Sequence, residues 1–423
     1  MIIHMSLVKK PRIRDYWSTT PIYDSHYASS LHMSRDRFSA ILTMLHLNNN
    51  ESYVPRGNPG HDPLHKVRPI VDHLFKQFSE QYIPLEQLTI DEGICGFRGR
   101  VRFRVFIKGK PEKYGIKIYE LCEAESGYAC AFEVYTGKDL LAEENLNSAL
   151  NVVDRLSTKY QNKGYTIYMD RYFSSPKVFD HLWEKGTKAV GTVMPNREGM
   201  PKQSFQKILK RGEFISRHRN HLLAVKWKDV RDVHMLSTVH KAEMRTDERS
   251  RQRKQKPAAV LDYNKYKVGV DRSDQLLAYY AYRRRQVKWW KKLFLHLFDL
   301  AIVNACILYN TTHAHKLRLQ QFMEAVAASL VMSVGLQDQE TGPGPQKEGR
   351  LLGRNHFPHK IPSTPGSGRT TGQRKCRVCA EKGKRTTGKA ARKETSIMCK
   401  QCDVPLCIGE CFEMFHKKEK YWE

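Results

Sequence analysis

Negatively charged residues are scarce in this chain. Its 423 residues include 44 aspartates and glutamates against 72 lysines and arginines, which leaves a formal net charge of +28 at pH 7. A positive field of this size requires an anionic partner. Nucleic acid, an anionic membrane surface and an acidic protein all satisfy that requirement, so the charge sets the class of partner without choosing among them.

A long uncharged hydrophobic run is also absent. The longest apolar stretch, residues 293–309, contains His296, Asp299 and Asn304, and such groups are costly inside a bilayer. The stretch therefore predicts a buried helix, and the chain is predicted to be soluble, without a membrane partner. No secretory signal opens the sequence either, because its first residues lead into a basic stretch from Lys9 to Arg14. We expect the protein to remain inside the cell.

Cysteine is sparse over most of the chain. Only four of the ten cysteines precede the last fifty residues, and they are Cys95, Cys122, Cys130 and Cys306. Because disulfides are rare inside cells and these four lie in apolar neighbourhoods, we predict ordinary core thiols. The other six are crowded near the C-terminus, and that crowding indicates metal binding.

The length of the chain predicts two or three domains. Residues 1–87 are predicted to form a small helical unit, in which the sequence shows no candidate catalytic residues. Ser34 can cap one helix there, with apolar residues from Phe38 to Leu45 on one face, and a second apolar stripe runs from Val67 to Phe78.

Residues 88–195 show a different pattern, in which short runs of Ile, Val, Tyr and Phe alternate with helical stripes. The expected elements are strands at 115–121 and 128–135, a helix at 146–156, a strand at 165–170, a helix from Ser175 to Gly186 and a strand at 189–194 that closes the block. Early strands followed by alternating helices and strands are typical of an α/β core of the RNase H kind.

The second half of the chain divides by composition. The expected segments are a polar insertion at 196–256, the last part of the core at 257–275, helical residues at 276–335, a Gly- and Pro-rich linker at 336–372 and a cysteine-rich module at 373–423. A single helix is expected from Asp271 to about Asn310. There are no internal repeats.

Four aspartates form a candidate catalytic centre. Asp91 lies toward the end of one predicted strand and Asp170 ends another, while Asp271 and Asp274 share a helical face. Divalent-metal phosphoryl transfer needs converging carboxylates, because Mg²⁺ prefers oxygen ligands and two ions can clamp an in-line displacement. A single aspartate at a strand end or helix start is more often a cap, so the spacing alone leaves both interpretations open.

The residues around these aspartates carry a family resemblance. The blocks are DEGICGFRGR, KPEKYGIKIYELCEAESGY, YMDRYFSSP, AVGTVMPNREGMP, WKDVRDVHMLST and YNKYKVGVDRSDQ, with YWSTTP and MSRDRFSAILTMLHLNNN before them. From about Tyr16 to the C-terminus, in this order, the chain resembles piggyBac transposases and piggyBac transposable-element-derived proteins.

The resemblance implies specific roles. Asp91, Asp170 and Asp271 match the family's aspartates that bind Mg²⁺ or Mn²⁺, and Asp274 matches the additional acid nearby. It also implies an RNase H-like core interrupted by an insertion and flanked by helical segments for DNA binding and dimerisation. The implied activity is DNA strand nicking, hairpin formation at transposon ends and joining into TTAA targets, carried out by a homodimer on double-stranded DNA.

One feature departs from the family pattern. Family members usually carry a long N-terminal extension before the YWS block, and here about fifteen residues precede it. A fragment, a mispredicted gene start and a shortened domesticated copy all fit. Besides the active transposase, two functional hypotheses therefore stay open: a domesticated DNA- or chromatin-binding protein that has lost transposition, and a nonfunctional relic of an element.

The C-terminal cysteines have the spacing of zinc ligands. The candidates are Cys376, Cys379, Cys399, Cys402, Cys407, Cys411 and His416. Two tetrahedral sites need an eighth ligand, for which His356 is favoured over His359. We predict two structural Zn²⁺ ions in a cross-brace, RING-like module whose folding depends on them. A ubiquitin-ligase role is remote, because the resemblance implies DNA-end binding.

Basic residues follow the expected last segment of the core. The candidate DNA-binding residues are Arg283, Arg284, Arg285, Lys288, Lys291 and Lys292. Trp289 and Trp290 between them suit base stacking or minor-groove wedging, and they suit a helix core equally well. The run from Arg249 to Lys256 fits a nuclear-entry signal, a phosphate patch or a solvated loop, and the nucleus is the expected location.

Overall fold

The computed structural model describes residues 1–24, 33–137, 148–248, 253–337, 356–363, 371–418 and 420–422. The chain forms two compact units, Met1–Ala328 and Ser329–Glu423. The boundary between them falls inside helix α10 (Leu319–Gln337), near the start of the expected linker.

A nine-stranded mixed sheet is the centre of the first unit. Its strands are β1 (Gln87–Gly96), β2 (Arg104–Phe106), β3 (Tyr114–Glu123), β4 (Ala129–Val134), β5 (Thr166–Met169), β6 (Lys188–Thr192), β7 (Phe214–Arg219), β8 (Leu222–Lys228) and β9 (Asp232–Ser237). They lie in the order β2-β3-β1-β5-β6-β9-β8-β7, with β4 also paired to β3. β1, β5 and β6 run parallel to one another, and the other pairs are antiparallel. The expected α/β class and the four strands expected between residues 115 and 194 are confirmed.

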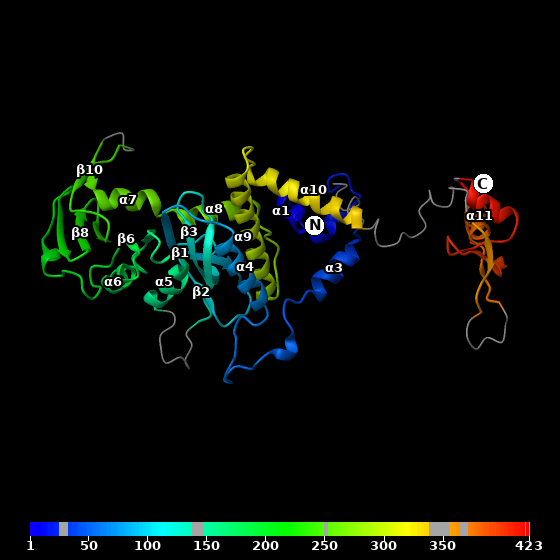
Figure 1. Cartoon of the computed structure of the whole chain (residues 1–423), viewed down its shortest axis with the longest axis horizontal. Coiled ribbons are helices and arrows are strands. Elements are labelled where there is room, and N and C mark those ends of the chain that lie inside the picture. The colour runs from blue at the N-terminus through cyan, green and yellow to red at the C-terminus, as the bar shows by residue number, and fades with distance from the viewer. Residues whose placement is uncertain are drawn as a thin grey trace. The chain divides into compact units, whose positions relative to one another are not determined.

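Helices cover the sheet because successive side chains of its central strands point to opposite faces. Ile167 and Met169 of β5 lie in the large core cluster, which also contains residues of α4 (Arg68–Glu80), α5 (Ala149–Ser157) and α6 (Pro176–Glu184). Tyr168 between them lies in a smaller cluster with α7 (Ala258–Tyr266). In Figure 1, β8 and β10 lie at one end of this unit and α1 and α3 at the other.

The expected helix starts before residue 190 are confirmed. Ser34 caps α3 (Arg35–Met44), where its side chain accepts a hydrogen bond from the backbone N–H of Arg37 at 3.2 Å. Ser175 caps α6 in the same way, at 3.3 Å from the N–H of Val178. α4 and α5 follow the expected stripes, although residues 146 and 147 lie outside the described part of the chain.

The strand at residues 189–194 was expected to close the core, and this expectation is wrong. β9 pairs with β6 on the side away from β5, and β8 and β7 extend the sheet further. The sequence concealed these strands because Lys226 and Lys228 interrupt the apolar run of β8. Residues 196–256 therefore add three strands to the central sheet, and β10 (Met244–Thr246) and β11 (Gln255–Pro257) form a separate hairpin.

The single helix expected from Asp271 to about Asn310 is also wrong. α8 (Gly269–Tyr280) ends at Ala281, whose backbone is extended, and α9 (Trp289–Thr312) begins after eight non-helical residues. In a continuous helix, Arg284 and Arg285 would lie one turn from Lys288, and such like-charge pairs disfavour a helix. The chain is instead held by Tyr282, whose backbone N–H donates to Asp299 at 2.9 Å. α7 was not expected at all.

α9 is long and apolar enough to cross a membrane, judged by length and composition alone. Its apolar side chains nevertheless belong to the protein core, because Leu293, Leu297 and Leu300 are fully buried there. Asn304 completes the packing, since its amide exchanges two hydrogen bonds with the backbone of Ala129, at 2.9 and 3.0 Å. These contacts are those of the buried helix that the sequence predicts.

The N-terminal residues pack against this later helical segment. Met5 of α1 (Ile2–Leu7), Tyr16 and Phe38 form one cluster with Tyr282 and Leu295. α4 packs on β4 and α9. The first 87 residues thus share cores with the rest of the unit, while the six boundaries between the seven segments expected from the sequence stay predictions.

The second unit is built from short elements. They are β12 (Pro358–Lys360), β13 (Arg374–Lys375), α11 (Arg377–Thr387), β14 (Glu394–Thr395), β15 (Ile397–Cys399), β16 (Val404–Pro405) and α12 (Glu410–Lys417). Its core cluster is small and includes Val378, Leu406 and Phe415 beside several cysteines. Such a core is too small to stabilise a fold by apolar burial alone. Of the expected linker, residues 338–355 and 364–370 lie outside the described part.

Candidate metal centres

Two neighbouring parallel strands bring the first pair of aspartates together. The register between β1 and β5 ends with Ile90 opposite Met169, so Asp91 and Asp170 follow at the same end of adjacent strands. Asp170 directly follows the last residue of β5, within one residue of the expected strand end. Asp91 differs slightly from expectation, because β1 continues to Gly96 through its pairing with β3.

A close helix–strand contact brings the second pair to the same place. α8 starts at Gly269, and a Cβ on this residue would lie 3.0 Å from both the Glu123 carbonyl and Thr89 Oγ1. Only glycine permits that approach without displacing the helix. Asp271 is the third residue of α8 and Asp274 lies one turn further on.

The charges of the aspartates act on two other side chains. Tyr263 of α7 is buried, and its pKa is raised to about 12 by burial first and then by the charges of Asp170, Asp91 and Asp271. Lys110 forms an ion pair with Asp274, with 3.2 Å between Nζ and Oδ2, and is also attracted by Asp91 and Asp271. The Tyr263 hydroxyl and the Lys110 ammonium are thus both influenced by the charges of Asp91 and Asp271, which lie on different elements.

The carboxylates are crowded and short of positive charge. Burial raises the pKa of Asp91 to about 7, and the charges of Glu92 and Asp170 add to the shift while Lys110 opposes it. Burial also raises the pKa of Asp274, against the effect of Lys110. A bound divalent cation would supply the missing charge. The donor set is therefore that of a hard, oxygen-preferring ion such as Mg²⁺.

The aspartates are more widely spaced than ligands around one ion. Among the described residues, groups of three or more possible ligand atoms within 4.8 Å of one another occur in the C-terminal module, and the aspartate set does not form such a group. Binding one ion between three of these carboxylates consequently requires a change in their relative positions.

The cysteine-rich module contains two compact ligand groups. The first is Cys376, Cys379, Cys407 and Cys411, and the second is His356, Cys399, Cys402 and His416. The groups alternate along the chain, which is the expected cross-brace. His356, the favoured eighth ligand, lies in the second group, and His359 lies in neither.

The distances within both groups match tetrahedral zinc. Cys379 and Cys411 have their sulfurs 3.6 Å apart, and His356 Nδ1 lies 3.5 and 3.4 Å from the sulfurs of Cys399 and Cys402. Ligands at about 2.0–2.3 Å from a tetrahedral ion lie roughly 3.3–3.8 Å apart. The ring of His416 donates from Nδ1 to the carbonyl of Phe412 at 2.7 Å, which turns Nε2 toward the ligand group, 3.5 Å from the sulfur of Cys402.

The expected DNA-binding residues divide into two kinds. Arg284 is tied to the N-terminal segment, since it donates to the Pro11 carbonyl at 2.8 Å and the Tyr16 hydroxyl at 3.0 Å. Lys291 likewise donates to the carbonyls of Leu42 and Thr43, and Lys292 is partly buried. Arg283, Arg285 and Lys288 are exposed and remain available to phosphates.

The two tryptophans belong to the core rather than to a stacking surface. Trp290 is buried and stacks on His46, and Trp289 packs edge-on against Phe103. In the basic run from Arg249, residues 249–252 lie outside the described part, and Lys256 forms an ion pair with Asp247 at 2.7 Å.

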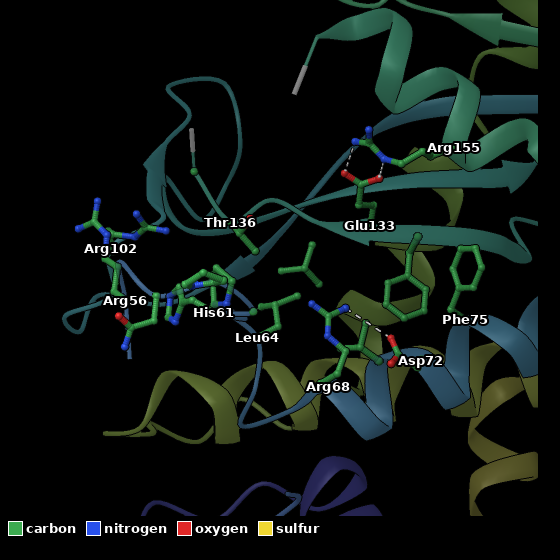
Figure 2. Close-up of a pocket in the computed structure, with 18 of the residues that line it drawn as sticks. Arg56, His61, Leu64, Arg68, Asp72, Phe75, Arg102, Glu133, Thr136 and Arg155 are labelled. Carbon is green, nitrogen blue, oxygen red and sulfur yellow. Dashed lines mark hydrogen bonds and ion pairs between the residues drawn. The ribbon is translucent and has the colours of Figure 1, made fainter. Parts of the chain in front are cut away.

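A groove of about 790 Å³ lies apart from the aspartates, between the α4 region and the end of β4 (Figure 2). Its walls combine apolar residues such as Phe75 with arginines. Arg155 is held by Glu133 in a two-pronged contact at 2.7 and 2.8 Å, and Arg68 by Asp72 at 3.4 Å. None of the four aspartates lines it.

The sequence did not single out three residues of the acidic centre: Lys110, Glu120 and Tyr263. Lys110 and Glu120 lie inside the block KPEKYGIKIYELCEAESGY and Tyr263 opens YNKYKVGVDRSDQ. The only signal was their membership of these blocks, because a lysine in a loop and a tyrosine in a helix carry no distinctive spacing.

Comparison with known proteins gives a consistent picture. The family model described as Transposase IS4 matches residues 1–306, and one described as a DDE_Tnp_1-like zinc finger matches residues 363–417. The human PiggyBac transposable element-derived protein 3 is 25% identical over 97% of this chain and 67% of its own length. The human Chimeric ERCC6-PGBD3 protein is 25% identical over 97% of this chain and 38% of its own length.

Two further similarities complete the comparison. The human PiggyBac transposable element-derived protein 2 is 28% identical over 73% of this chain and 54% of its own length. This chain therefore spans between about two fifths and two thirds of these relatives. A piggyBac transposase solved as a synaptic complex with hairpin DNA matches with a TM-score of 0.71 and 25% identity, over 96% of this chain and 84% of that one. The RNase H-like core expected from the sequence is confirmed by this match.

Proposed function

From the premise that this chain belongs to the piggyBac-type transposase family, we propose that it is a divalent-metal-dependent DNA transposase. It nicks DNA at transposon ends and joins the released ends to TTAA targets. Its partner is double-stranded DNA, it acts as a homodimer, and it works in the nucleus. The net charge of +28 and the match to a transposase–DNA complex support the choice of DNA.

The placement of Asp91 and Asp170 at the same end of two adjacent parallel strands, with Asp271 on a helix that packs on the first of them, is the observation that carries this proposal. The three residues come from elements that are distant in sequence. Caps of independent elements would have no reason to lie at one end of the sheet. Their common location, with Asp274 and Lys110, is the arrangement that phosphoryl transfer needs.

In the proposed reaction, Asp91, Asp170 and Asp271 would hold Mg²⁺ or Mn²⁺. Such ions, when bound, would supply Lewis-acid stabilisation of the attacking and leaving oxygens. Lys110 holds Asp274 in place through its ion pair. Tyr263, whose pKa is raised to about 12, is protonated at neutral pH, so its hydroxyl is a hydrogen-bond donor. The exposed Arg283 and Lys288 supply phosphate contacts that orient the duplex.

Cleavage of a labelled duplex tests the proposal. The substrate is taken from inverted repeats that flank the coding segment, with a TTAA junction, and is incubated with the zinc-loaded chain and Mg²⁺. We expect nicked and hairpin products on a denaturing gel. Asp170→Asn should abolish them, because it removes a metal ligand yet keeps the acceptor for the Tyr172 N–H, now 2.8 Å from Asp170 Oδ1.

Asp72→Asn is the matched control. Asp72 is an aspartate with 63% of its side chain exposed, in the groove away from the proposed centre. The control should cut as well as the parent chain. Equal cutting by the Asp170 variant, or no cutting by the parent chain on any flanking repeat, would reject the transposase function.

A second candidate function is DNA or chromatin binding without cleavage. The curated relatives carry names of proteins derived from transposable elements, and this observation favours it. Binding should then persist in magnesium-free buffer without chelator, which keeps zinc in place, and Mg²⁺ or Mn²⁺ should yield no products. Cleavage that depends on Asp170 would exclude this alternative.

A further inference from the structure

A fifth carboxylate lies under the acidic centre. Glu120 of β3 has no exposed surface. Its Oε2 accepts only the weak S–H donor of Cys122, at 3.8 Å, and its Oε1 has no hydrogen-bond partner among the described residues. Buried carboxylates are costly unless they are paired. This one is therefore expected to have a partner that the chain itself does not supply.

The unpartnered oxygen faces the candidate catalytic groups. Glu120 lies directly opposite Asp91 in the register of β1 and β3, so both side chains project from the same face of the sheet. A Cβ on Gly93 would lie 2.6 Å from Glu120 Oε1 and 3.7 Å from Asp274 Oδ1. The two carboxylates thus border one small space above Gly93, which the missing side chain keeps open.

The charges around Glu120 favour a cation in that space. Burial raises its pKa to about 8, and the charges of Asp274 and Asp91 contribute to the shift, while Lys110 opposes it. Lys110 itself donates to Asp274 rather than to Glu120. Its single positive charge leaves the group of carboxylates net negative.

We propose that Glu120 is a further metal-binding residue of the acidic centre. With Asp91 and Asp274, it holds a hydrated divalent cation. Mg²⁺ keeps several of its waters when it binds protein carboxylates. A buried oxygen without a partner accepts hydrogen bonds from such waters and orients them. This inference rests on the proposed metal-dependent function and adds a residue that no catalytic motif in the sequence marks.

Metal affinity of the full, zinc-loaded chain tests it without any cleavage assay. Mn²⁺ is titrated and its free fraction followed by electron paramagnetic resonance. Glu120→Gln keeps the shape of the side chain and removes the charge, and we expect Mn²⁺ affinity to fall about tenfold, the loss typical of removing a partner in the outer shell of a metal. Glu120→Met, which removes both oxygens, should weaken binding at least as much.

Glu123→Gln provides a matched control on the same strand. Glu123 is equally buried, yet its carboxylate accepts hydrogen bonds from Tyr82, Ser126 and the backbone N–H of Leu85, the last at 2.9 Å. This variant should lose stability and keep its Mn²⁺ affinity. Glu120→Gln should do the opposite, with an unchanged or higher melting temperature without metal and a smaller increase on adding Mn²⁺.

The outcomes separate this inference from the proposed function. Tight Mn²⁺ binding that Asp91→Asn abolishes and both Glu120 variants leave unchanged would overturn the role of Glu120 alone. Absence of Mn²⁺ binding in the parent chain would overturn both proposals. A lower metal-free melting temperature of Glu120→Gln, with an unchanged increase on Mn²⁺ addition, would identify Glu120 as a purely structural residue.

Discussion

Asn304 permits a quantitative test of how the edge of the central sheet is stabilised. Its side chain is 3% exposed and pairs with both backbone groups of Ala129 on β4. In Asn304→Ala, one buried N–H and one buried carbonyl lose their partners. Each orphaned group costs about 1–3 kcal/mol, so we expect a loss of about 2–6 kcal/mol in the free energy of unfolding.

A second asparagine on α9 supplies the control. Asn310 makes the same paired contact with the backbone of Leu317, at 2.8 and 2.9 Å, but both residues are partly exposed. Water can replace the lost bonds there, so Asn310→Ala should cost roughly 0.5–1.5 kcal/mol, the net value of ordinary hydrogen bonds. The two variants remove identical atoms and differ in burial.

Urea unfolding gives the global loss, and hydrogen exchange of the peptide that contains Ala129 gives the local one. Protection of that peptide should fall sharply in Asn304→Ala and stay unchanged in Asn310→Ala. Equal losses in the two variants would refute the reasoning, because burial of the orphaned groups would then have no energetic consequence.

Three further predictions concern other parts of the chain. Zinc removal, or His416→Ala, should unfold the C-terminal module, measured as rapid proteolysis after residue 356 and fewer than two zinc ions per chain, because its small core depends on metal. Asp299 has a pKa raised to about 7 by burial, so its contribution to stability is complete below about pH 4 and is lost as pH rises through 7. Asp299→Asn should therefore raise the free energy of unfolding at pH 8 by up to about 4 kcal/mol, seen as a higher melting temperature. It should have no effect at pH 4. Gly269→Ala places a Cβ 3.0 Å from the Glu123 carbonyl; it should cost about 1–3 kcal/mol and reduce cleavage by shifting Asp271, whereas a stable and fully active variant would contradict the role of this contact.

Local signals in the sequence predicted the helix starts because capping is local chemistry. Ser34 and Ser175 each accept a hydrogen bond from an N–H three residues later, and such a contact needs no tertiary context. The zinc ligands were predicted for a similar reason. Paired cysteines with two or three residues between them can reach one ion through the local geometry of the chain.

The errors occurred where tertiary contacts decide the structure. Lys226 is tolerated in a buried strand because its ammonium donates to the carbonyls of Phe205 and Lys207, at 2.7 and 2.9 Å. A lysine therefore interrupts the apolar sequence of β8, although the strand belongs to the central sheet. The break after Tyr280 depends on Asp299, a residue seventeen positions beyond Tyr282. No window of local periodicity contains both partners of such a contact.

The same distinction separates the two buried glutamates of β3. Glu123 accepts hydrogen bonds from the hydroxyls of Tyr82 and Ser126 and from the backbone N–H of Leu85, and these contacts stabilise the fold. Glu120, three residues earlier, receives no comparable donor and faces other carboxylates. A fold that only needed a well-packed strand would place an apolar side chain there, as it does at the adjacent Leu121. Keeping an acid at this position costs stability in the absence of a cation, and that cost is what a metal-binding role accounts for.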